Sequence, residues 1–497
     1  MKRGIFSLSA GILGVVTLLA APLLSAAQVQ MKEETLPFAP PPKEWKAFTP
    51  SVRFSADQKR MAIVCRFEKK FAVLVDGKLS ASYDAISKDS PHFSPNSAQV
   101  VFTAKKGNKW FVVKDGKEGA GYEAVSMFVF SPDSKRLAYV AQKDKETFSV
   151  VADGKEFPGF AGVMKDSLEF SPDSKRFTYI VSNDKKKMAM VIDGKPGPLY
   201  EQVGPILFSP DSQRYAYKAQ RGNKWFMVMD GKELTPWEMT GVYSFSRDSQ
   251  RFAYTVKEGE TWSMVEGGKK GPAYDGVGIA AFSPDSRRMA YLAIKDKLWF
   301  IVVDGKKERS FEEIGILSFS DDSRHCAYNA RDGKKQFMVV DGKVGETYNT
   351  VFYPIFSPDS KHFGFRAQKG EKWLVVMDGK EGKAYKEDTS PVFSPDSKHS
   401  AYLAQKEDTW VLVRDGVEGP AYASMASPTW SPDSAHLACL GEMNDSWLIL
   451  VDGKPAKTQF SGFIKGSQLL FDSPKLIRSL AIRLPGPAFV RYNLTLP

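Results

Sequence analysis

A unit of 37 residues recurs along most of this 497-residue chain. Each copy opens with an aromatic residue that is followed in most copies by Ser-Pro-Asp-Ser, as in residues 282–286. A fixed period of this length is typical of repeat architectures such as solenoids and propellers. The eleven opening aromatic residues stand at positions 54, 93, 130, 170, 208, 245, 282, 319, 356, 393 and 430. This period constrains the fold more strongly than any other feature of the sequence.

Within a repeat, turn signals alternate with short apolar runs. Ser-Pro-Asp suits a type I turn, because proline presets the backbone of its second position. Residues 137–141 and 110–113 are apolar at nearly every step, which is typical of strands buried on both faces. Asp-Gly follows in ten copies and is a strong signal for a two-residue hairpin. A further short strand carries an aromatic residue such as Tyr122.

Four short strands per repeat, without a helical period, predict an all-β fold. We expect a β-propeller of about twelve four-stranded blades of ~37 residues, because each blade can bury its apolar faces only against its neighbours. Two six-bladed rings in tandem are the simplest division, with a first ring over residues 45–278 and a second over 279–497. Rings of five and seven blades, or one large ring, remain alternatives, since the even spacing contains no linker.

Both ends of the repeat region carry part of one more blade. Trp45 stands nine residues before Phe54, close to the spacing of the fourth-strand aromatic elsewhere, so residues 43–50 are predicted to be a spare fourth strand. Residues 471–474 resemble the start of a repeat, and 476–483 and 488–496 are predicted strands. Together these segments would form a composite twelfth blade that joins the termini.

The N-terminal segment predicts export. Residues 1–27 combine a basic start, a mostly apolar stretch from Ile5 to Leu24 and small residues before Gln28, as in a secretory signal peptide cleaved after Ala27. Residues 28–44 are a Pro-rich lead-in. No other segment is apolar for long enough to span a bilayer, so we expect a periplasmic or secreted protein without a transmembrane anchor after cleavage.

The pattern Phe-Ser-Pro-Asp-Ser-Lys-Arg-Leu-Ala-Tyr at 130–139 resembles the WD-repeat-like propeller repeat of the TolB-type family, over about residues 50–475. The chain departs from that family where it has Ser134, Ser174 or Ser286 in place of the usual turn glycine. From the residues that flank the repeats we expect neither the N-terminal domain of TolB nor a hydrolase domain, and no Gly-x-Ser-x-Gly motif occurs in the sequence. The resemblance therefore implies an envelope-associated bacterial binding protein and transfers no active site.

Four of the five histidines share one position of the repeat, whereas the three cysteines stand at three different positions. His325, His362, His399 and His436 stand six residues after the opening aromatic, where seven earlier copies have arginine or glutamine. The alternatives are a metal-binding or pH-sensitive arc and a local partner for the turn aspartate three residues earlier. Equivalent positions on neighbouring sheets are too far apart for one zinc ion, so no metal site is assigned. The three cysteines fall in apolar strand positions and are predicted buried thiols.

Basic residues gather in the loops between second and third strands. Removing Lys2 and Arg3 leaves 67 Lys and Arg against 58 Asp and Glu, a net charge of +9. Alternate loops of a propeller share a face, so these loops predict a candidate binding face for an envelope protein or an anionic polymer; an ordinary solvated surface is the alternative. Its residues are Lys105, Lys106, Lys109, Lys185, Lys186, Lys187, Arg221, Lys224, Lys334, Lys335, Lys369 and Lys372.

The sequence favours an exported, non-catalytic propeller that binds or scaffolds a protein or an anionic macromolecule in the bacterial envelope. No catalytic, cofactor-binding or metal-binding residue is assigned, and no nucleic-acid-binding motif is present. A propeller hydrolase or lyase with a site in the central funnel is the alternative. Polar residues that break the repeat near the axis would favour that enzyme.

Overall fold

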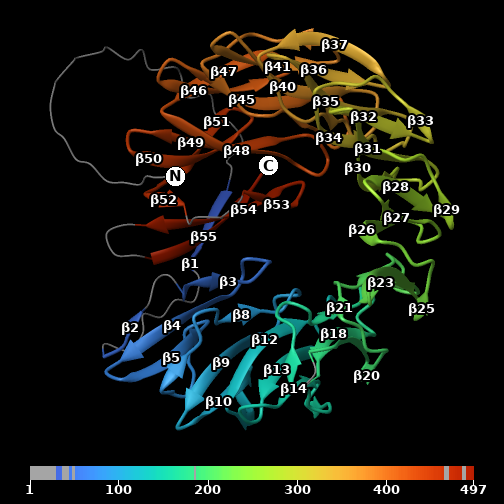
Figure 1. The fold of residues 1–497 in the computed structure, drawn as a ribbon. Helices are drawn as coiled ribbons and strands as arrows, with labels where there is room; N and C mark the ends of the chain where they lie inside the picture. The colour runs from blue at the N-terminus through green and yellow to red at the C-terminus, as the bar shows by residue number, and fades with distance from the viewer. Residues whose placement is uncertain are drawn as a thin grey trace.

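The computed structural model describes residues 30–35, 44–47, 51–183, 186–463, 469–483 and 488–496. Across these residues the chain forms antiparallel sheets and no α-helix. The strands assemble into twelve sheets of four or five strands each, which confirms the predicted all-β propeller of about twelve blades (Figure 1). We number the blades 1 to 12 in chain order, so that blade 1 contains the first opening aromatic, Phe54.

The first strand of each blade, in one or two pieces, leads to the opening aromatic. The pieces are β2 (Lys46–Ala47) and β3 (Arg53–Phe54); β7 (Ala85–Ile86) and β8 (His92–Phe93); β12 (Ala124–Phe130); β16 (Gly162–Val163) and β17 (Glu169–Phe170); β21 (Gln202–Val203) and β22 (Leu207–Phe208); β26 (Met239–Phe245); β30 (Gly276–Phe282); β34 (Glu313–Phe319); β38 (Thr350–Val351) and β39 (Ile355–Phe356); β43 (Glu387–Asp388) and β44 (Val392–Phe393); β48 (Ser424–Trp430); and β52 (Gly462–Phe463) and β53 (Leu470–Ser473).

The second and third strands form the middle of each sheet. The second strands are β4 (Met61–Phe67), β9 (Val100–Lys106), β13 (Leu137–Gln142), β18 (Phe177–Ser182), β23 (Tyr215–Arg221), β27 (Phe252–Glu258), β31 (Met289–Lys295), β35 (Cys326–Asp332), β40 (Phe363–Lys369), β45 (Ser400–Lys406), β49 (Leu437–Met443) and β54 (Leu476–Arg483). The third strands are β5 (Lys70–Val75), β10 (Lys109–Lys114), β14 (Phe148–Ala152), β19 (Met188–Ile192), β24 (Lys224–Met229), β28 (Thr261–Glu266), β32 (Leu298–Val303), β36 (Lys335–Val340), β41 (Lys372–Met377), β46 (Thr409–Arg414), β50 (Ser446–Val451) and β55 (Ala488–Thr495).

The outer strands complete the sheets. They are β6 (Lys78–Leu79), β11 (Lys117–Tyr122), β15 (Lys155–Glu156), β20 (Lys195–Pro196), β25 (Lys232–Glu233), β29 (Lys269–Lys270), β33 (Lys306–Lys307), β37 (Lys343–Tyr348), β42 (Lys380–Glu381), β47 (Val417–Tyr422), β51 (Lys454–Phe460) and, in blade 12, β1 (Gln30–Thr35).

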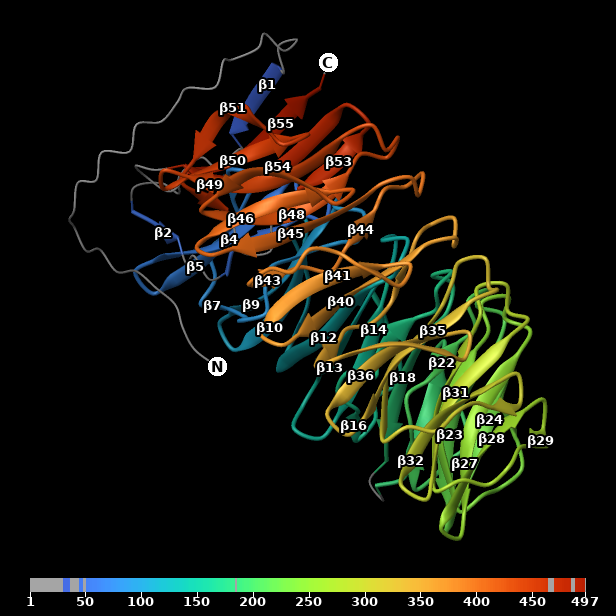
Figure 2. The ribbon, with the colours of Figure 1, turned by 90° about the horizontal axis from the view of Figure 1, so that it is seen from above.

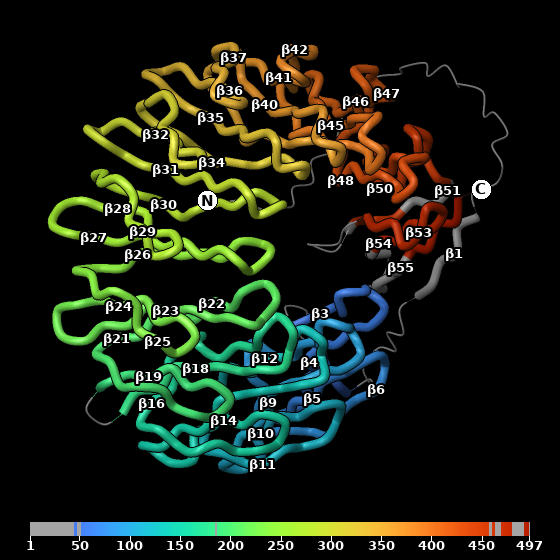
Figure 3. Tube along the Cα trace, turned by 90° about the vertical axis from the view of Figure 1, so that its right-hand side faces the viewer, coloured from blue at the N-terminus to red at the C-terminus, as the bar shows by residue number. Residues whose placement is uncertain are grey.

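The blades follow one another in chain order along a single curved path (Figures 1 and 3). First strands such as β26, β30 and β34 lie toward the centre of this path, and outer strands such as β25, β29 and β33 lie on its outside. Figure 2 shows the first and last blades together at one end of the molecule and the middle blades at the other. Among the arrangements left open by the sequence, this path corresponds to one large ring.

The division into rings over 45–278 and 279–497 gains no support from the strand boundaries. Residue 278 lies inside β30, so the predicted boundary would cut the first strand of blade 7. Blades 6 and 7 are also in direct contact, because the side-chain Oγ of Ser244 donates to the backbone carbonyl of Ala280 at 2.8 Å. The reason is the even repeat length, which gives every neighbouring pair of blades the same connection.

The hydrophobic core lies between neighbouring sheets. One group of buried side chains joins Val140 and Val150 of blade 3 to Tyr179 and Val191 of blade 4. The second and third strands are buried on both faces, as their continuous apolar runs predict. Each blade therefore depends on its neighbours for the burial of its apolar surface.

Each Ser-Pro-Asp-Ser turn is held by its own side chains. In blade 3, Ser131 Oγ donates to Asp133 Oδ1 at 2.6 Å, and the N–H of Arg136 donates to Ser131 Oγ at 2.9 Å. Ser134, the last residue of the turn, has a φ of +64°. This left-handed conformation costs a residue with a Cβ about 1–2 kcal/mol, so glycine would be the ordinary choice.

A hydrogen bond between blades explains the serine. The N–H of the turn Asp133 donates to Ser174 Oγ in the next blade at 2.9 Å. The same bond recurs in ten consecutive pairs from blade 1 to blade 11: Asp57–Ser97, Asn96–Ser134, Asp133–Ser174, Asp173–Ser212, Asp211–Ser249, Asp248–Ser286, Asp285–Ser323, Asp322–Ser360, Asp359–Ser397 and Asp396–Ser434. Glycine would relieve the backbone but would leave this N–H without its partner.

Blade 12 joins the two ends of the chain. Strand β1 pairs antiparallel with β55, from Gln30 opposite Thr495 to Thr35 opposite Val490. Strands β54 and β52 continue the sheet, with β53 also on β54. The predicted composite twelfth blade is therefore confirmed, but its N-terminal strand comes from residues 30–35, inside the segment 28–44 that was expected to be an extended lead-in.

The prediction that residues 43–50 supply that strand is wrong for residues 44–47, the part of this segment that the structure describes. Strand β2 pairs with β4 of blade 1, where Lys46 faces Arg66 and Ala47 faces Cys65. The Trp45 ring packs against Phe67, with ring centroids 5.7 Å apart. In other repeats, too, the first strand begins just after this aromatic, as β7 does after Tyr83 and β26 after Trp237, so Trp45 leads into the first strand of blade 1.

Two further sequence expectations have different outcomes. Cys65, Cys326 and Cys439 are buried and free, as predicted, and burial raises the pKa of Cys65 to about 11. Residues 1–27 lie outside the described residues, so the signal peptide and its cleavage after Ala27 stay predictions. Within the described ranges, no helix is long and apolar enough to cross a membrane.

Pairing of β1 should be measurable as thermal stability. Alternate N–H groups of a strand point at its partner, so replacing both Lys32 and Glu33 by proline removes at least one ladder hydrogen bond. We expect Tm to fall by about 2–5 °C in this variant, and also after deletion of residues 28–40. The double alanine variant keeps both N–H groups and is the control. Unchanged melting of the proline variant in circular dichroism would contradict a structural role for β1.

Two substitutions of Ser174 test the contribution of the hydrogen bond between blades. Ser174→Ala keeps the strained backbone and loses the hydroxyl, whereas Ser174→Gly loses the hydroxyl but relieves the strain. We expect the alanine variant to be less stable than the wild type by about 1 kcal/mol and less stable than the glycine variant by a similar amount. Urea denaturation measures all three proteins. Equal stability of the alanine variant and the wild type would show that the bond contributes nothing.

Candidate functional site

The loops between second and third strands emerge on one face, together with the connections from each outer strand to the next blade. We call this the loop face. The predicted basic residues lie at these loops: Lys106 and Arg221 end second strands, and Lys109 and Lys224 begin third strands. Lys185 lies outside the described residues. The turns that join first to second and third to outer strands lie on the opposite, hairpin face.

Five of the predicted basic side chains are already paired with carboxylates. These ion pairs are Lys106–Glu118 (3.3 Å), Lys109–Glu123 (2.7 Å), Lys187–Glu201 (3.0 Å), Arg221–Glu233 (2.7 Å) and Lys369–Glu381 (2.9 Å). Exposed pairs of this kind contribute little to stability. Each pair does cancel one positive charge, so about half of the predicted basic residues add no net positive charge to the loop face.

Carboxylates also hold the loops themselves. Glu201 accepts the N–H of Gly222 at 3.2 Å, and Glu238 accepts that of Gly259 at 2.7 Å. Asp84, Asp275 and Glu312 do the same for the loops of blades 2, 7 and 8. The loop face therefore has alternating charges. Six of the described residues in the predicted basic set form no ion pair. They are Lys105, Lys186, Lys224, Lys334, Lys335 and Lys372.

Where the residue six positions after the opening aromatic is arginine, it contacts both its own blade and the next one. Arg136 Nε lies 2.8 Å from Asp153 Oδ2, the aspartate of the Asp-Gly hairpin in the same blade. The same guanidinium donates to the carbonyl oxygen of Lys175 in blade 4 at 2.6 Å. Arginine therefore supplies one contact within its blade and another to the next blade.

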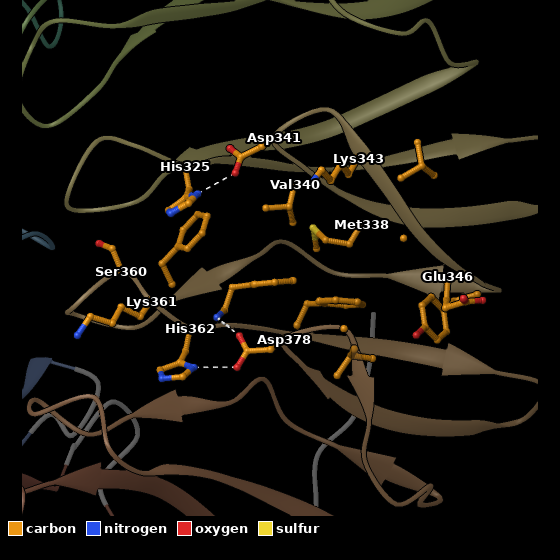
Figure 4. Close-up of a pocket in the computed structure, with 18 residues that line it drawn as sticks. His325, Met338, Val340, Asp341, Lys343, Glu346, Ser360, Lys361, His362 and Asp378 are labelled. Carbon is orange, nitrogen blue, oxygen red and sulfur yellow. Dashed lines mark hydrogen bonds and ion pairs between the residues drawn. The ribbon is translucent and has the colours of Figure 1, made fainter.

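Histidine keeps the contact with the hairpin aspartate, but among the described residues its ring forms no hydrogen bond to a carbonyl of the next blade. His325 Nδ1 lies 2.7 Å from Asp341 Oδ2, and His362 Nδ1 lies 2.8 Å from Asp378 Oδ2 (Figure 4). The predicted pairing with the turn aspartate three residues earlier is wrong, for histidine and arginine alike. Asp322 Oδ1 is already occupied by Ser320 Oγ and the N–H of Arg324.

The two histidines border a cavity of about 460 Å³ between blades 8 and 9 (Figure 4). Its walls are mainly apolar, with Met338, Phe356 and Phe363 among them. A similar cavity of about 590 Å³ lies between blades 5 and 6, where the position holds arginine. The cavity is thus a recurring gap between blades. No group of three or more His, Cys, Asp and Glu side chains that could hold a metal ion occurs in the described ranges.

An ion pair between blades 9 and 10 breaks the repeat and was missed from sequence. Arg366 Nε lies 2.6 Å from Asp388 Oδ1, and the Asp388 side chain is fully buried. The guanidinium also stacks on Trp373, 3.8 Å from the ring centroid. Asp388 Oδ2 has no hydrogen-bond partner, and burial raises the pKa of Asp388 to about 6. The signal was available, because several other repeats have an apolar residue at each of these two positions.

Comparisons with known proteins give no family for this chain. No protein-family model and no curated protein matches it. Solved structures that resemble it include TolB from Acinetobacter baumannii, at 14% identity and a TM-score of 0.23, covering 52% of this chain and 77% of that one. The β-propeller domain of the Trilobed protease from Pyrococcus furiosus matches at 12% identity and a TM-score of 0.25, covering 60% and 94%.

A third structure, the Dos1 propeller, matches at 10% identity with a TM-score of 0.28, covering 69% of this chain and 95% of that one. These proteins are propellers like this chain. The finer resemblance to the TolB-type family stays a prediction.

The buried aspartate predicts a pH dependence. Unfolded aspartate has a pKa of about 3.9, so the folded protein holds an extra proton at Asp388 between about pH 4 and pH 6. The contribution of Asp388 to the free energy of unfolding is therefore greatest at low pH and falls, by roughly 3 kcal/mol, as pH rises through this window. Relative to Asp388→Asn, the wild-type Tm should fall between pH 4 and pH 7. Parallel pH profiles for the two proteins would contradict the buried carboxylate; Glu371→Gln, at an exposed residue, is the control.

Proposed function

We propose that this chain is an exported, non-catalytic propeller of the bacterial envelope that binds an anionic polymer through its hairpin face. One observation supports this proposal. In ten of the twelve blades the outer strand begins with an exposed lysine that follows the Asp-Gly hairpin or its Gly-Gly counterpart. These ten are Lys78, Lys117, Lys155, Lys195, Lys232, Lys269, Lys306, Lys343, Lys380 and Lys454. We call them the lysine rim.

The rim keeps its charge because the nearby acids are engaged elsewhere. The hairpin Asp153 pairs with Arg136, and most other hairpin aspartates pair in the same way with arginine or histidine. Glu118 and Glu233 of the outer strands turn to loop-face bases. No rim lysine forms an ion pair within the part of the chain that the structure describes. In contrast, about half of the predicted loop-face set is neutralised.

An evenly spaced rim suits a long, flexible partner. Figure 1 shows outer strands such as β25, β29 and β33 following one another along the outside of the molecule. Exposed charges act over about 8–10 Å at physiological salt, so each lysine attracts a separate segment of a polyanion. Many weak contacts along one molecule add up to useful affinity, and the field of the rim speeds the encounter.

The enzyme alternative has one specific residue to consider. A carboxyl group with a raised pKa, such as Asp388, is what a general acid requires. The Asp388 side chain is fully enclosed between blades and its near oxygen is taken by Arg366, so a substrate has no path to it. This geometry favours a structural ion pair.

Charge reversal on each face tests the proposal. Dextran sulfate and poly-glutamate serve as labelled probes, and we expect affinity to fall steeply with added salt. Changing Lys117, Lys195, Lys306 and Lys380 to glutamate should weaken binding by about tenfold or more, because each lost contact contributes to one multivalent interaction. The control reverses four unpaired loop-face lysines, Lys105, Lys224, Lys334 and Lys372.

Comparing the two variants locates the binding face. A loss confined to the rim set supports the rim, whereas a loss confined to the control set would move the site to the predicted loop face and reject the rim. An equal loss in both would mean that only net charge matters. Tm is measured for both variants, since neither should change it by much.

A further inference from the structure

Four exposed apolar side chains lie at equivalent positions in blades 6 to 9. They stand three residues before the opening aromatic, at position −3. Their exposed fractions are 44% for Val242, 55% for Ile279, 60% for Ile316 and 46% for Tyr353. Because they occur in consecutive blades, they form one row on the first strands, which face the centre of the curved path (Figure 1). We call them the apolar row.

The same position holds serine in blades 1, 2, 4, 10 and 11, and there it can have an inward role. Ser51 and Ser90 are buried, and each hydroxyl accepts a backbone N–H from the second strand of its own blade. Ser51 accepts from Val64 at 2.8 Å, and Ser90 accepts from Thr103 at 2.9 Å. Serine at position −3 therefore closes an irregularity between the first and second strands.

Blades 6 and 8 make this contact in the reverse direction. The N–H of Val242 donates to Thr255 Oγ1, and the N–H of Ile316 donates to Asn329 Oδ1, both at 3.1 Å. The second strand now supplies the polar atom, so position −3 is free to carry an outward apolar side chain. Gly241 precedes Val242, and a Cβ there would collide with Thr255 Oγ1. In blades 6 and 8, three positions thus change together where the side chain at position −3 is exposed.

The exposed strands also offer backbone groups. Strands β26, β30 and β34 are at the end of their sheets, so one side of each has N–H and C=O groups without a neighbouring strand. Val242 and Ile316 lie where the pairing register shifts, which leaves them outside the regular ladder. An occupant with both apolar side chains and a peptide backbone can use both features, whereas an acyl chain can use only the first.

The loops near the row carry charges of both signs, but most of their carboxylates are engaged in ion pairs, such as Glu258 with Lys270 and Asp275 with Lys295. The loops of blades 7 to 9 and blade 5 carry exposed lysines without an ion pair in the described ranges: Lys224, Lys297, Lys334, Lys335 and Lys372. These loops lie on the loop face, at the end of the blades where the first strands begin. Exposed lysines within about a Debye length favour acidic residues beside the apolar contact.

We propose that the apolar row binds a segment of a partner protein in which apolar residues are flanked by acidic ones. The segment lies across the first strands of blades 6 to 9, its apolar side chains on Val242, Ile279, Ile316 and Tyr353. Its acidic flanks meet the loop lysines. This site is separate from the lysine rim, so the protein has a polymer-binding face and a peptide-binding inner surface.

A synthetic peptide tests the row. The probe is a fluorescein-labelled peptide of about 16 residues with leucines at its centre and glutamates at both ends. Val242, Ile279 and Ile316 are changed together to serine, the residue that blades 1 and 2 have at this position. We expect peptide affinity to fall by about tenfold or more, because each change removes buried apolar contact. The control changes three exposed apolar residues of other positions, Leu199, Leu298 and Val417, to serine.

Two further measurements keep the outcome clear. A benzophenone side chain at position 316 should crosslink the peptide, and one at position 298 should not. Peptides with serine in place of leucine, or lysine in place of glutamate, should bind at least about tenfold more weakly. Wild-type protein that ignores the peptide, or an equal loss in the row and control variants, would overturn the inference.

Failure here is distinguishable from failure of the proposed function. Dextran sulfate binding should survive the serine changes in the row, and peptide binding should survive charge reversal of the rim. Tm of the triple serine variant is expected to stay close to that of the wild type, since serine already occupies position −3 in blades 1 and 2. If Tm of the triple variant drops strongly, the crosslinking experiment still tests the site, because it leaves Val242 and Ile279 unchanged.

Discussion

One hydrogen bond, repeated from blade to blade, sets the relation between neighbouring sheets. The N–H of Asp133 on Ser174 Oγ, and its nine equivalents, connect blades 1 to 11 without a break. Apolar packing between sheets is stronger in total, but it is not directional. The turn bond is directional, so it fixes how far each sheet rotates against the next. The strained serine conformation is retained because its hydroxyl performs this task.

The repeat made the architecture readable from the sequence, since turns, hairpins and buried strands each leave a local signal. The turn serine, the hairpin Asp-Gly and the apolar second strand were all found where the pattern placed them. Pairing across long separations leaves no such signal. Strand β1 has the sequence Gln-Met-Lys-Glu-Glu-Thr, which lacks the apolar pattern of a buried strand, and only the structure shows it against β55.

Side-chain partners were harder to predict than strands, for a geometric reason. His325 is three residues from Asp322 and sixteen from Asp341, yet the hairpin brings the distant aspartate closer to its ring. The charge balance of the loop face also depends on pairs such as Lys106–Glu118 that cross from one strand to another. The Arg366–Asp388 pair and the apolar row were visible as departures from the repeat, but a departure alone does not reveal exposure. Val242 and Asp388 both differ from most equivalents, and one is exposed while the other is buried.

The composite blade has a consequence for the order in which the protein forms. Blades 1 to 11 can each assemble from contiguous chain as it becomes available, and every new blade needs only its predecessor. Blade 12 cannot, because Thr35 faces Val490 and almost the whole chain separates them. Closing so long a loop costs more entropy than any hairpin and slows the step that requires it. The N-terminal strand therefore has no partner during nearly all of synthesis, and a chain truncated late would hold eleven stacked blades with an exposed edge at the place of the twelfth.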